Sequence, residues 1–291
     1  NGGWPQGDAS FTGPSRPTDA FIDYYQKHRH IFGDLKIEIF DQGGKLVDTI
    51  PGSKHRGLNR AQWSMRLKPP IVPPAASALF SAAQGPRILP GSYTIKMTKG
   101  DQTYTEALKV VLDPRAKFTV DDRKAQFQLI MKLHKMLGHM SYAVAALQGV
   151  RDDALARSGK LSDKDPLRGR LRQLSTNLDA LRSKIVATKE GGAITGEERI
   201  REHLGELYGD VNTYEGKPTD YQVARGESLG HELEDVIVDF RKLTDKELPT
   251  INTALKKKKL EAVSVLSEAD WEKQHEESSP KSAETMAQET D

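Results

Sequence analysis

The chain has 291 residues, 36% of them hydrophobic and 29% charged, which allows one large domain or two ordinary ones. Its 43 Lys and Arg nearly cancel its 41 Asp and Glu, and a net charge of +2 argues against a general nucleic-acid-binding protein. The chain has no cysteine, which excludes disulfides, cysteine-ligated zinc, iron–sulfur clusters and thiol catalysis, and no run approaches the ~20 apolar residues of a membrane span.

The first residues, "NGGWPQGDAS", contain neither a basic stretch nor an apolar stretch, and the chain does not begin with Met. We therefore expect a fragment or a processed product, with any export signal upstream. Residues 1–18 are interpreted as a linker.

A period of two marks residues 19–113 as β-structure. In "DLKIEIF", Leu35, Ile37 and Ile39 share one face of a strand. The segments "AFIDYYQ", "RAQWSMRL" and "GSYTIKMTKGDQTYTEALKVVL" are further strand candidates. Short strands without helical patterns between them predict an antiparallel Ig-like β-sandwich.

The glycine pair Gly43–Gly44, followed by Lys45, allows two interpretations. A phosphate-binding loop needs glycines that lead into a helix, with Ser or Thr after the lysine. Here Leu46 follows the lysine, and both flanks alternate as strands do. The pattern therefore favours a β-hairpin turn.

The segment "PPIVPPAASALFSAAQGPRILPG", from Pro69 to Gly91, interrupts the strand pattern with six prolines. It is long for a connection within a compact domain, and its prolines exclude a central strand. Loops of this length are usually functional, interfacial or mobile. The stretch "AASALFSAAQ" is compatible with one or two helical turns packed on a neighbour.

After Thr119, a predicted N-cap, apolar residues recur at spacings of three and four residues, as on one face of a helix. The four stripes run from Phe127 to Leu147, Leu167 to Ile185, Ile200 to Val211, and Leu229 to Leu243, and the last is compatible with an extension past Pro249 through Ile251 and Leu255. They predict an up-down four-helix bundle over residues 114–262. Residues 263–291 are polar and are interpreted as a flexible tail.

No catalytic, cofactor-binding or metal-binding group is indicated. His28 and His30 lack a third ligand nearby, and His134 and His139 are five residues apart on a predicted helix, so they do not face one ligand. Trp63 shares a face with Ala61, Met65 and Leu67, which favours a core position over a sugar-stacking platform. The run Lys256–Lys259 suits a solvated helix end better than an anionic surface.

Three long stretches, at residues 21–70, 85–115 and 185–212, together resemble the C-terminal region of bacterial sortilin-like β-propeller proteins. These proteins carry Asp-box (BNR-type) repeats and are often labelled glycosyl hydrolases. The elements "GLNR…W" and "G-x-Y-T…LDPR" are the most specific part, and they resemble an Ig-like module related to that of the flagellar hook-capping protein. The resemblance covers nearly all of residues 20–260 and implies a propeller upstream, where any hydrolytic site is expected. No Asp-box repeat occurs in this chain, so the label does not transfer as an activity.

We therefore expect a non-catalytic accessory or interaction region of an exported protein, in the periplasm, on the cell surface or outside the cell. One alternative is a part of a glycoside hydrolase, which for retaining chemistry needs two carboxyl groups ~5 Å apart; nothing in the sequence marks such a pair. The other alternative is a carbohydrate-binding module, which requires Trp63 or Trp4 on an open face.

The expected partner is the upstream β-propeller or a separate chain of a larger assembly. The candidate interface consists of apolar residues without a periodic partner face nearby: Trp4, Phe11, Ile71, Val72, Leu79, Phe80 and Ile88. Exposed together, such residues would form an apolar patch that soluble monomers usually avoid. The alternative for the proline-rich loop is that it folds back over the sandwich core.

Overall fold

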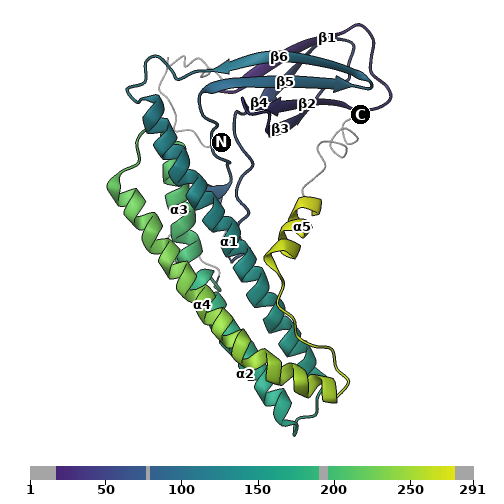
Figure 1. Cartoon of the computed structure of the whole chain (residues 1–291), viewed down its shortest axis with the longest axis vertical. Coiled ribbons are helices and arrows are strands. Elements are labelled where there is room, and N and C mark those ends of the chain that lie inside the picture. The colour runs from purple at the N-terminus through teal and green to yellow at the C-terminus, as the bar shows by residue number, and fades with distance from the viewer. Residues whose placement is uncertain (1–17, 77–78, 190–195, 279–291) are drawn as a thin grey trace, which may run out of the picture.

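The structure is a computed structural model that describes residues 18–76, 79–189 and 196–278. Antiparallel strands come first along the chain and helices follow. The strands form a β-unit at one end of a long helical unit (Figure 1). The predicted order, antiparallel β-structure followed by helices, is confirmed.

The β-unit consists of two antiparallel sheets, one of two strands and one of four. The smaller sheet pairs β1 (Ala20–Gln26) with β4 (Gly57–Trp63). The larger sheet has the order β3-β2-β5-β6, with β2 at Leu35–Phe40, β3 at Leu46–Pro51, β5 at Gly91–Lys99 and β6 at Gln102–Val110. Alternate side chains of both sheets enter one core around Trp63, which is fully buried, as predicted.

The glycine pair forms the β2–β3 hairpin turn, and the phosphate-loop alternative is excluded. The Asp41 carboxylate accepts hydrogen bonds from the backbone N–H groups of Gly43 and Lys45, each at 2.9 Å. Gly44 has a φ of 76°, which a side chain would strain. The chain then continues as β3 rather than as a helix.

Strand β4 ends at Trp63, although the alternating pattern predicted a longer run to Leu67. Met65 has a φ of 55° and breaks the strand there. Its side chain and that of Leu67 nevertheless pack against the sandwich core. Apolar residues therefore keep alternating beyond Trp63, where the regular strand ends, and the sequence pattern alone placed the end of the strand too late.

The helical unit contains α1 (Val120–Gly159), α2 (Pro166–Ile185), α3 (Ile200–Thr213) and α4 (Asp220–Lys257). The predicted cap is present, since the Thr119 hydroxyl accepts a hydrogen bond from the N–H of Asp122 at 3.1 Å. Residues of the predicted apolar stripes bury their side chains in one shared core.

These four helices lie in three columns, because α2 and α3 follow one another in the same direction (Figure 1). Near the start of α1, Gln126 donates a hydrogen bond to the carbonyl of Val211 in α3. Further along α1, Arg151 instead binds Asp179 of α2 at 2.8 Å. Helix α4 runs back past both, and Lys258 just beyond its end pairs with Asp165 at the start of α2. The four helices predicted to lie side by side therefore form an up-down arrangement of three columns.

The segment after residue 262 is packed against the helices within the described residues, in contrast to the flexible tail that was predicted. Val263 and Trp271 are buried, and residues 268–278 form helix α5 (Glu268–Ser278). The Trp271 ring meets that of Tyr142 edge to face, with centroids 6.3 Å apart. Two isolated apolar residues show no period, so sequence patterns could not mark this contact. No helix within the described ranges is long and apolar enough to cross a membrane.

Candidate interaction surface

The outward side of the β1–β4 sheet presents three cross-strand pairs to solvent. The register places Phe21 opposite Gln62, Asp23 opposite Arg60, and Tyr25 opposite Leu58. The exposed fractions are 44% for Phe21, 70% for Tyr25 and 76% for Leu58. We call this side the outer face.

The inward side of the same sheet explains why these residues face out. Asn59, Ala61 and Trp63 of β4 are buried, so Leu58, Arg60 and Gln62, which alternate with them, point the other way. On β1, Gln26 is buried and its amide donates a hydrogen bond to the carbonyl of Ser53 at 2.8 Å. The Tyr24 hydroxyl donates to the same carbonyl, also at 2.8 Å. Burial on one side and polar anchoring fix the register of the sheet.

An ion pair lies at the centre of the outer face. The Arg60 guanidinium donates two hydrogen bonds to the Asp23 carboxylate, at 2.7 and 2.8 Å. It also lies 4.9 Å from the centroid of the Phe21 ring. Hydrogen bonding by Arg60 lowers the pKa of Asp23, and the same bond raises the pKa of Arg60. The two charges cancel locally, which leaves a neutral centre with apolar side chains on both sides.

The loop that follows β1 adds two further exposed apolar side chains, Ile31 at 69% and Phe32 at 84%. The backbone N–H of His30 donates to the carbonyl of Lys54 at 3.0 Å, which ties the loop to the segment before β4. We call the five exposed large apolar side chains of β1, β4 and this loop the apolar surface: Phe21, Tyr25, Ile31, Phe32 and Leu58. Single exposed apolar residues are ordinary, but several in one supersecondary unit indicate a contact surface.

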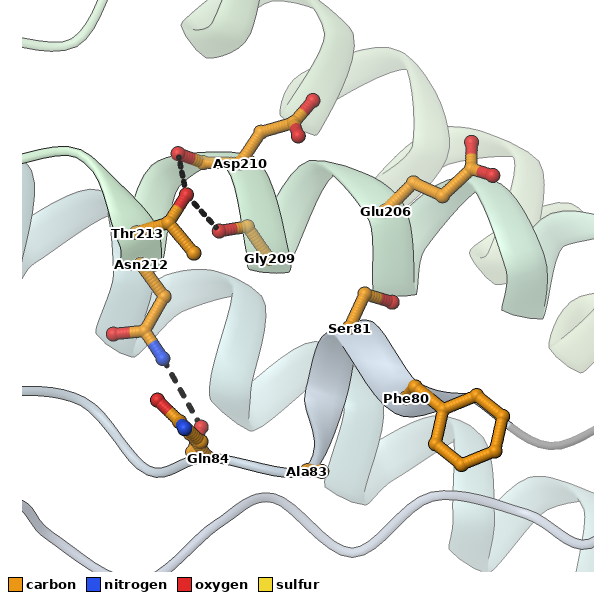
Figure 2. Close-up of a pocket in the computed structure, with 9 residues that line it drawn as sticks. All are labelled: Phe80, Ser81, Ala83, Gln84, Glu206, Gly209, Asp210, Asn212 and Thr213. Carbon is orange, nitrogen blue, oxygen red and sulfur yellow. Dashed lines mark hydrogen bonds between the residues drawn. The ribbon is translucent and has the colours of Figure 1, made fainter. Parts of the chain in front are cut away.

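A cavity of about 560 Å³ lies between α3 and the short helix η1 (Phe80–Ala82) of the proline-rich loop (Figure 2). Its lining includes the exposed Phe80 and the α3 carboxylates Glu206 and Asp210. The Asn212 amide donates to the carbonyl of Gln84 at 3.1 Å, which closes one side of the cavity. These contacts hold the loop on the helix.

Most of the proline-rich loop lies on the helices of its own chain, which neither sequence alternative described. Its end, at Ile88, packs in the core of the β-unit, as the fold-back alternative expected. The Ser141 hydroxyl donates to the carbonyl of Ile71 at 2.9 Å, and the Arg201 guanidinium donates to the carbonyl of Pro73 at 2.8 Å. The Tyr208 hydroxyl donates to the carbonyl of Gln84 at 2.8 Å. The partner face is therefore supplied by α1 and α3, which are distant in sequence.

The candidate interface residues consequently separate into three groups. Val72 and Leu79 pack against the helical core, and Ile88 is buried in the sandwich core. Ile71 and Phe80 are exposed, at 41% and 84%. Trp4 and Phe11 lie outside the described residues. The sequence analysis did not predict that Phe21, Tyr25 and Leu58 are exposed. The available signal was in "AFIDYYQ", where Phe21 and Tyr25 share a strand face with the charged Asp23.

The polar clusters within the described residues support the fold. No group of three or more His, Asp or Glu there is arranged to hold a metal ion. His134 contacts the carbonyl of Lys68 at 3.1 Å, whereas His139 contacts Glu268 at 3.0 Å, so the two do not share a ligand. Trp63, fully buried, offers no open stacking platform.

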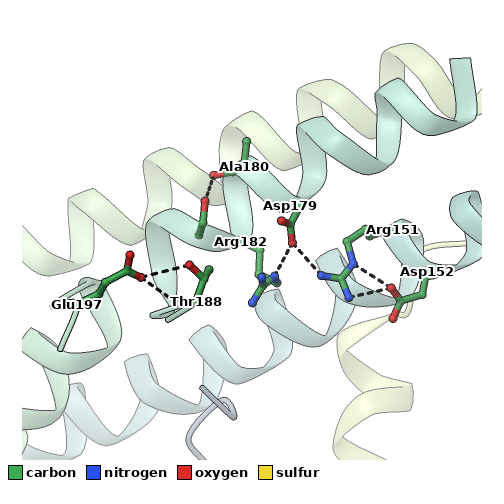
Figure 3. Close-up of polar contacts among 8 residues, drawn as sticks. Arg151, Asp152, Asp179, Ala180, Arg182, Thr188 and Glu197 are labelled. Atoms are coloured by element: carbon green, nitrogen blue, oxygen red, sulfur yellow. Dashed lines mark hydrogen bonds and ion pairs between the residues drawn. The ribbon is translucent and has the colours of Figure 1, made fainter. Parts of the chain in front are cut away.

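Figure 3 shows one of these networks, in which Asp179 of α2 accepts from Arg151 of α1 at 2.8 Å and from Arg182 at 2.9 Å. Partial burial opposes ionisation of Asp179, but the two guanidinium groups outweigh it and lower its pKa. Nearby, the Glu197 carboxylate accepts from the N–H of Thr188 at 2.9 Å. The Asp179 network joins α1 to α2, and the separate Thr188–Glu197 contact joins the segment after α2 to the approach to α3.

In comparisons with protein-family models, curated proteins and solved structures, none matches this chain. The likeness to sortilin-like propeller proteins therefore rests on the sequence stretches alone.

Proposed function

We propose that this chain is a non-catalytic interaction region of an exported, sortilin-like propeller protein, in which an Ig-like sandwich and a helical unit mediate protein–protein assembly. The observation that carries the proposal is the apolar surface, because five large apolar side chains are exposed on β1, β4 and the loop after β1. A module that binds another protein needs an exposed apolar surface of this kind and does not need catalytic side chains.

The position of the surface suits a partner on the N-terminal side. Residues 1–18 lead directly into β1, and an extended segment of this length reaches at most about 60 Å. A domain that precedes this segment would lie within that reach of β1. Trp4 and Phe11 lie on the segment itself and would add aromatic side chains to the contact.

The chemistry of the surface favours protein over the other ligands considered. The central charges of the outer face, Asp23 and Arg60, neutralise one another, and its other cross-strand pairs carry no charge. Positive charge lies beside it on the loop after β1, at the exposed Lys27 and Arg29. Apolar and aromatic residues around a satisfied polar centre are typical of the middle of protein interfaces.

The experiment is a binding assay between this chain and the separately expressed upstream region. We expect the double variant Tyr25→Ser and Leu58→Ser to bind about tenfold or more weakly, because both side chains lose apolar contact area. The matched control is Tyr104→Ser with Tyr221→Ser, which removes side chains that are 51% and 73% exposed on other elements. Equal binding by the two double variants would contradict the proposal.

The glycosidase alternative predicts a different result. If this chain contributes to a hydrolytic site, it should support turnover of a glycoside that is lost when a particular Asp or Glu of this chain is replaced. The carbohydrate-binding alternative now depends on Trp4 alone, because Trp63 is buried.

A further inference from the structure

Three arginines converge where the β-unit meets the helices, and we call them the arginine junction: Arg66, Arg87 and Arg123. Arg66 follows β4, Arg87 precedes β5, and Arg123 lies in the first turns of α1. They come from three separate segments, so local sequence does not bring them together.

Arg66 and Arg87 lie directly opposite one another in an antiparallel bridge. The flanking backbone bonds, Leu67 N–H to Pro86 carbonyl at 2.8 Å and Ile88 N–H to Met65 carbonyl at 3.0 Å, leave the arginines as a non-hydrogen-bonded pair. Side chains of such a pair project to the same side, with Cβ atoms about 5 Å apart. Like charges in this position repel, so the arrangement needs a compensating negative charge.

Arg123 reaches the same place from α1. It is 5% exposed, and its guanidinium donates to the carbonyl of Ile88 at 3.4 Å and to the Gln126 amide oxygen. Ile88 adjoins Arg87, so the Arg123 charge is added to the opposed pair. Burial lowers the pKa of Arg123 and of Arg66, and Arg87 lowers both further, which reflects the mutual repulsion.

The protein supplies too little negative charge at this point. Arg87 pairs with Glu215, whereas Arg66 donates only to neutral oxygens, the carbonyl of Gly85 at 2.8 Å and the amide of Asn212 at 3.3 Å. Within the described ranges, Glu215 is the one carboxylate that these guanidinium groups contact. The end of α3 adds only about half a negative charge through its dipole. More than one positive charge is thus left without a counter-charge.

We propose that the arginine junction binds an oxyanion, a phosphate or carboxylate group, between Arg66 and Arg87. Planar guanidinium groups match both kinds of oxyanion through paired hydrogen bonds. The site is reachable, because the side chains of Arg87 and Glu215 are 39% and 31% exposed. Bound there, the anion would offset the repulsion between two arginines that also contact Asn212 and Glu215 of the helical unit. This inference is independent of the proposed protein-binding function.

The test compares thermal unfolding of the whole chain in sodium phosphate, sodium acetate and sodium chloride at equal ionic strength. For the unmodified chain, phosphate or acetate should raise the midpoint by about 3 °C over chloride, through binding to the folded state alone. In Arg87→Gln this rise should disappear. The matched control is Arg60→Gln, which removes the same charge from the exposed outer face and should keep the full rise.

Two outcomes would overturn the proposal. One is an equal rise in all three proteins, which would reflect the general effect of these salts on protein surfaces. The other would come from adding phosphate or acetate stepwise to the chain while the arginine side-chain N–H signals are recorded in ¹H–¹⁵N spectra. We expect the Arg66 and Arg87 Nε–H signals to shift and then saturate as anion is added. The anion that the site prefers, phosphate or acetate, should give the larger shifts. Linear shifts with both anions would mean that no site exists.

Discussion

His134 lies where α1 meets the proline-rich loop. Its Nε2 is 3.1 Å from the carbonyl of Lys68, and its ring centroid is 6.4 Å from that of Tyr208. Burial lowers its pKa below the ordinary 6.5, although the hydrogen bonds to the loop carbonyls act in the opposite direction. The folded state therefore favours neutral histidine.

This residue should make stability depend on pH. In the unfolded chain the imidazole binds a proton near pH 6.5, whereas in the folded chain it does so only at lower pH. Between these two pH values the unfolded state holds more protons, so the free energy of unfolding rises with pH and levels off above 6.5. Replacing His134 with Gln, which keeps a donor for the Lys68 carbonyl, should flatten that rise. Urea unfolding between about pH 5 and pH 7.5 measures it, and an unchanged slope in the variant would contradict the assignment.

At the residue scale, sequence patterns predicted core positions only where neighbours shared a period. Trp63 was placed correctly because Ala61 and Met65 alternate with it. Trp271 was missed because its partner, Tyr142, lies more than a hundred residues away and no stripe surrounds it. Burial of an isolated residue depends on tertiary neighbours that a local pattern does not contain.

At the scale of elements, the proline-rich loop is held against α3 by two glycines. A Cβ on Gly205 would lie 2.4 Å from the nearest methyl of Leu79, and one on Gly209 would lie 2.8 Å from Cβ of Ser81. The loop can approach α3 this closely because neither position has a side chain.

Gly209→Ala should therefore lower the free energy of unfolding by about 1–3 kcal/mol, because the new methyl group pushes η1 off the helix. The matched control is Gly149→Ala on α1, where a Cβ meets nothing within 4 Å. There the better helix propensity of alanine should stabilise the protein by about 0.5–1 kcal/mol. Urea unfolding of both variants checks the difference in sign, and stabilisation by both would show that the loop does not rest on α3.

Elements were predicted better than their arrangement. Period-two and helical stripes located the strands and helices, because each element buries one face whatever covers it. The same stripes do not say whether α2 and α3 lie side by side or end to end. The loop was expected to need another surface because Val72 and Leu79 have no local partners; α1 and α3 provide those partners after folding. The apolar surface was not predicted, since exposed aromatics on a strand look like core residues in the sequence.

At the scale of the whole molecule, the long helical columns carry the β-unit at one end (Figure 1). The loop from Pro69 and the contacts of Arg66 with Asn212 and of Arg87 with Glu215 join the two units. A contact made on the β-unit is thus held in a defined position relative to the helices. This arrangement suits a structural role in a larger assembly.

Amide hydrogen exchange tests most directly whether the apolar surface is a protein contact. The exchange of the whole chain is measured alone and with the upstream region added. We predict that the amides of Ala82, Ala83 and Ile88 are already protected in the chain alone, because each donates a backbone hydrogen bond. On addition of the partner, protection should increase in residues 20–34 and 57–63 and stay constant in 102–110. Unchanged exchange in 20–34 and 57–63 when the partner is bound would contradict the account.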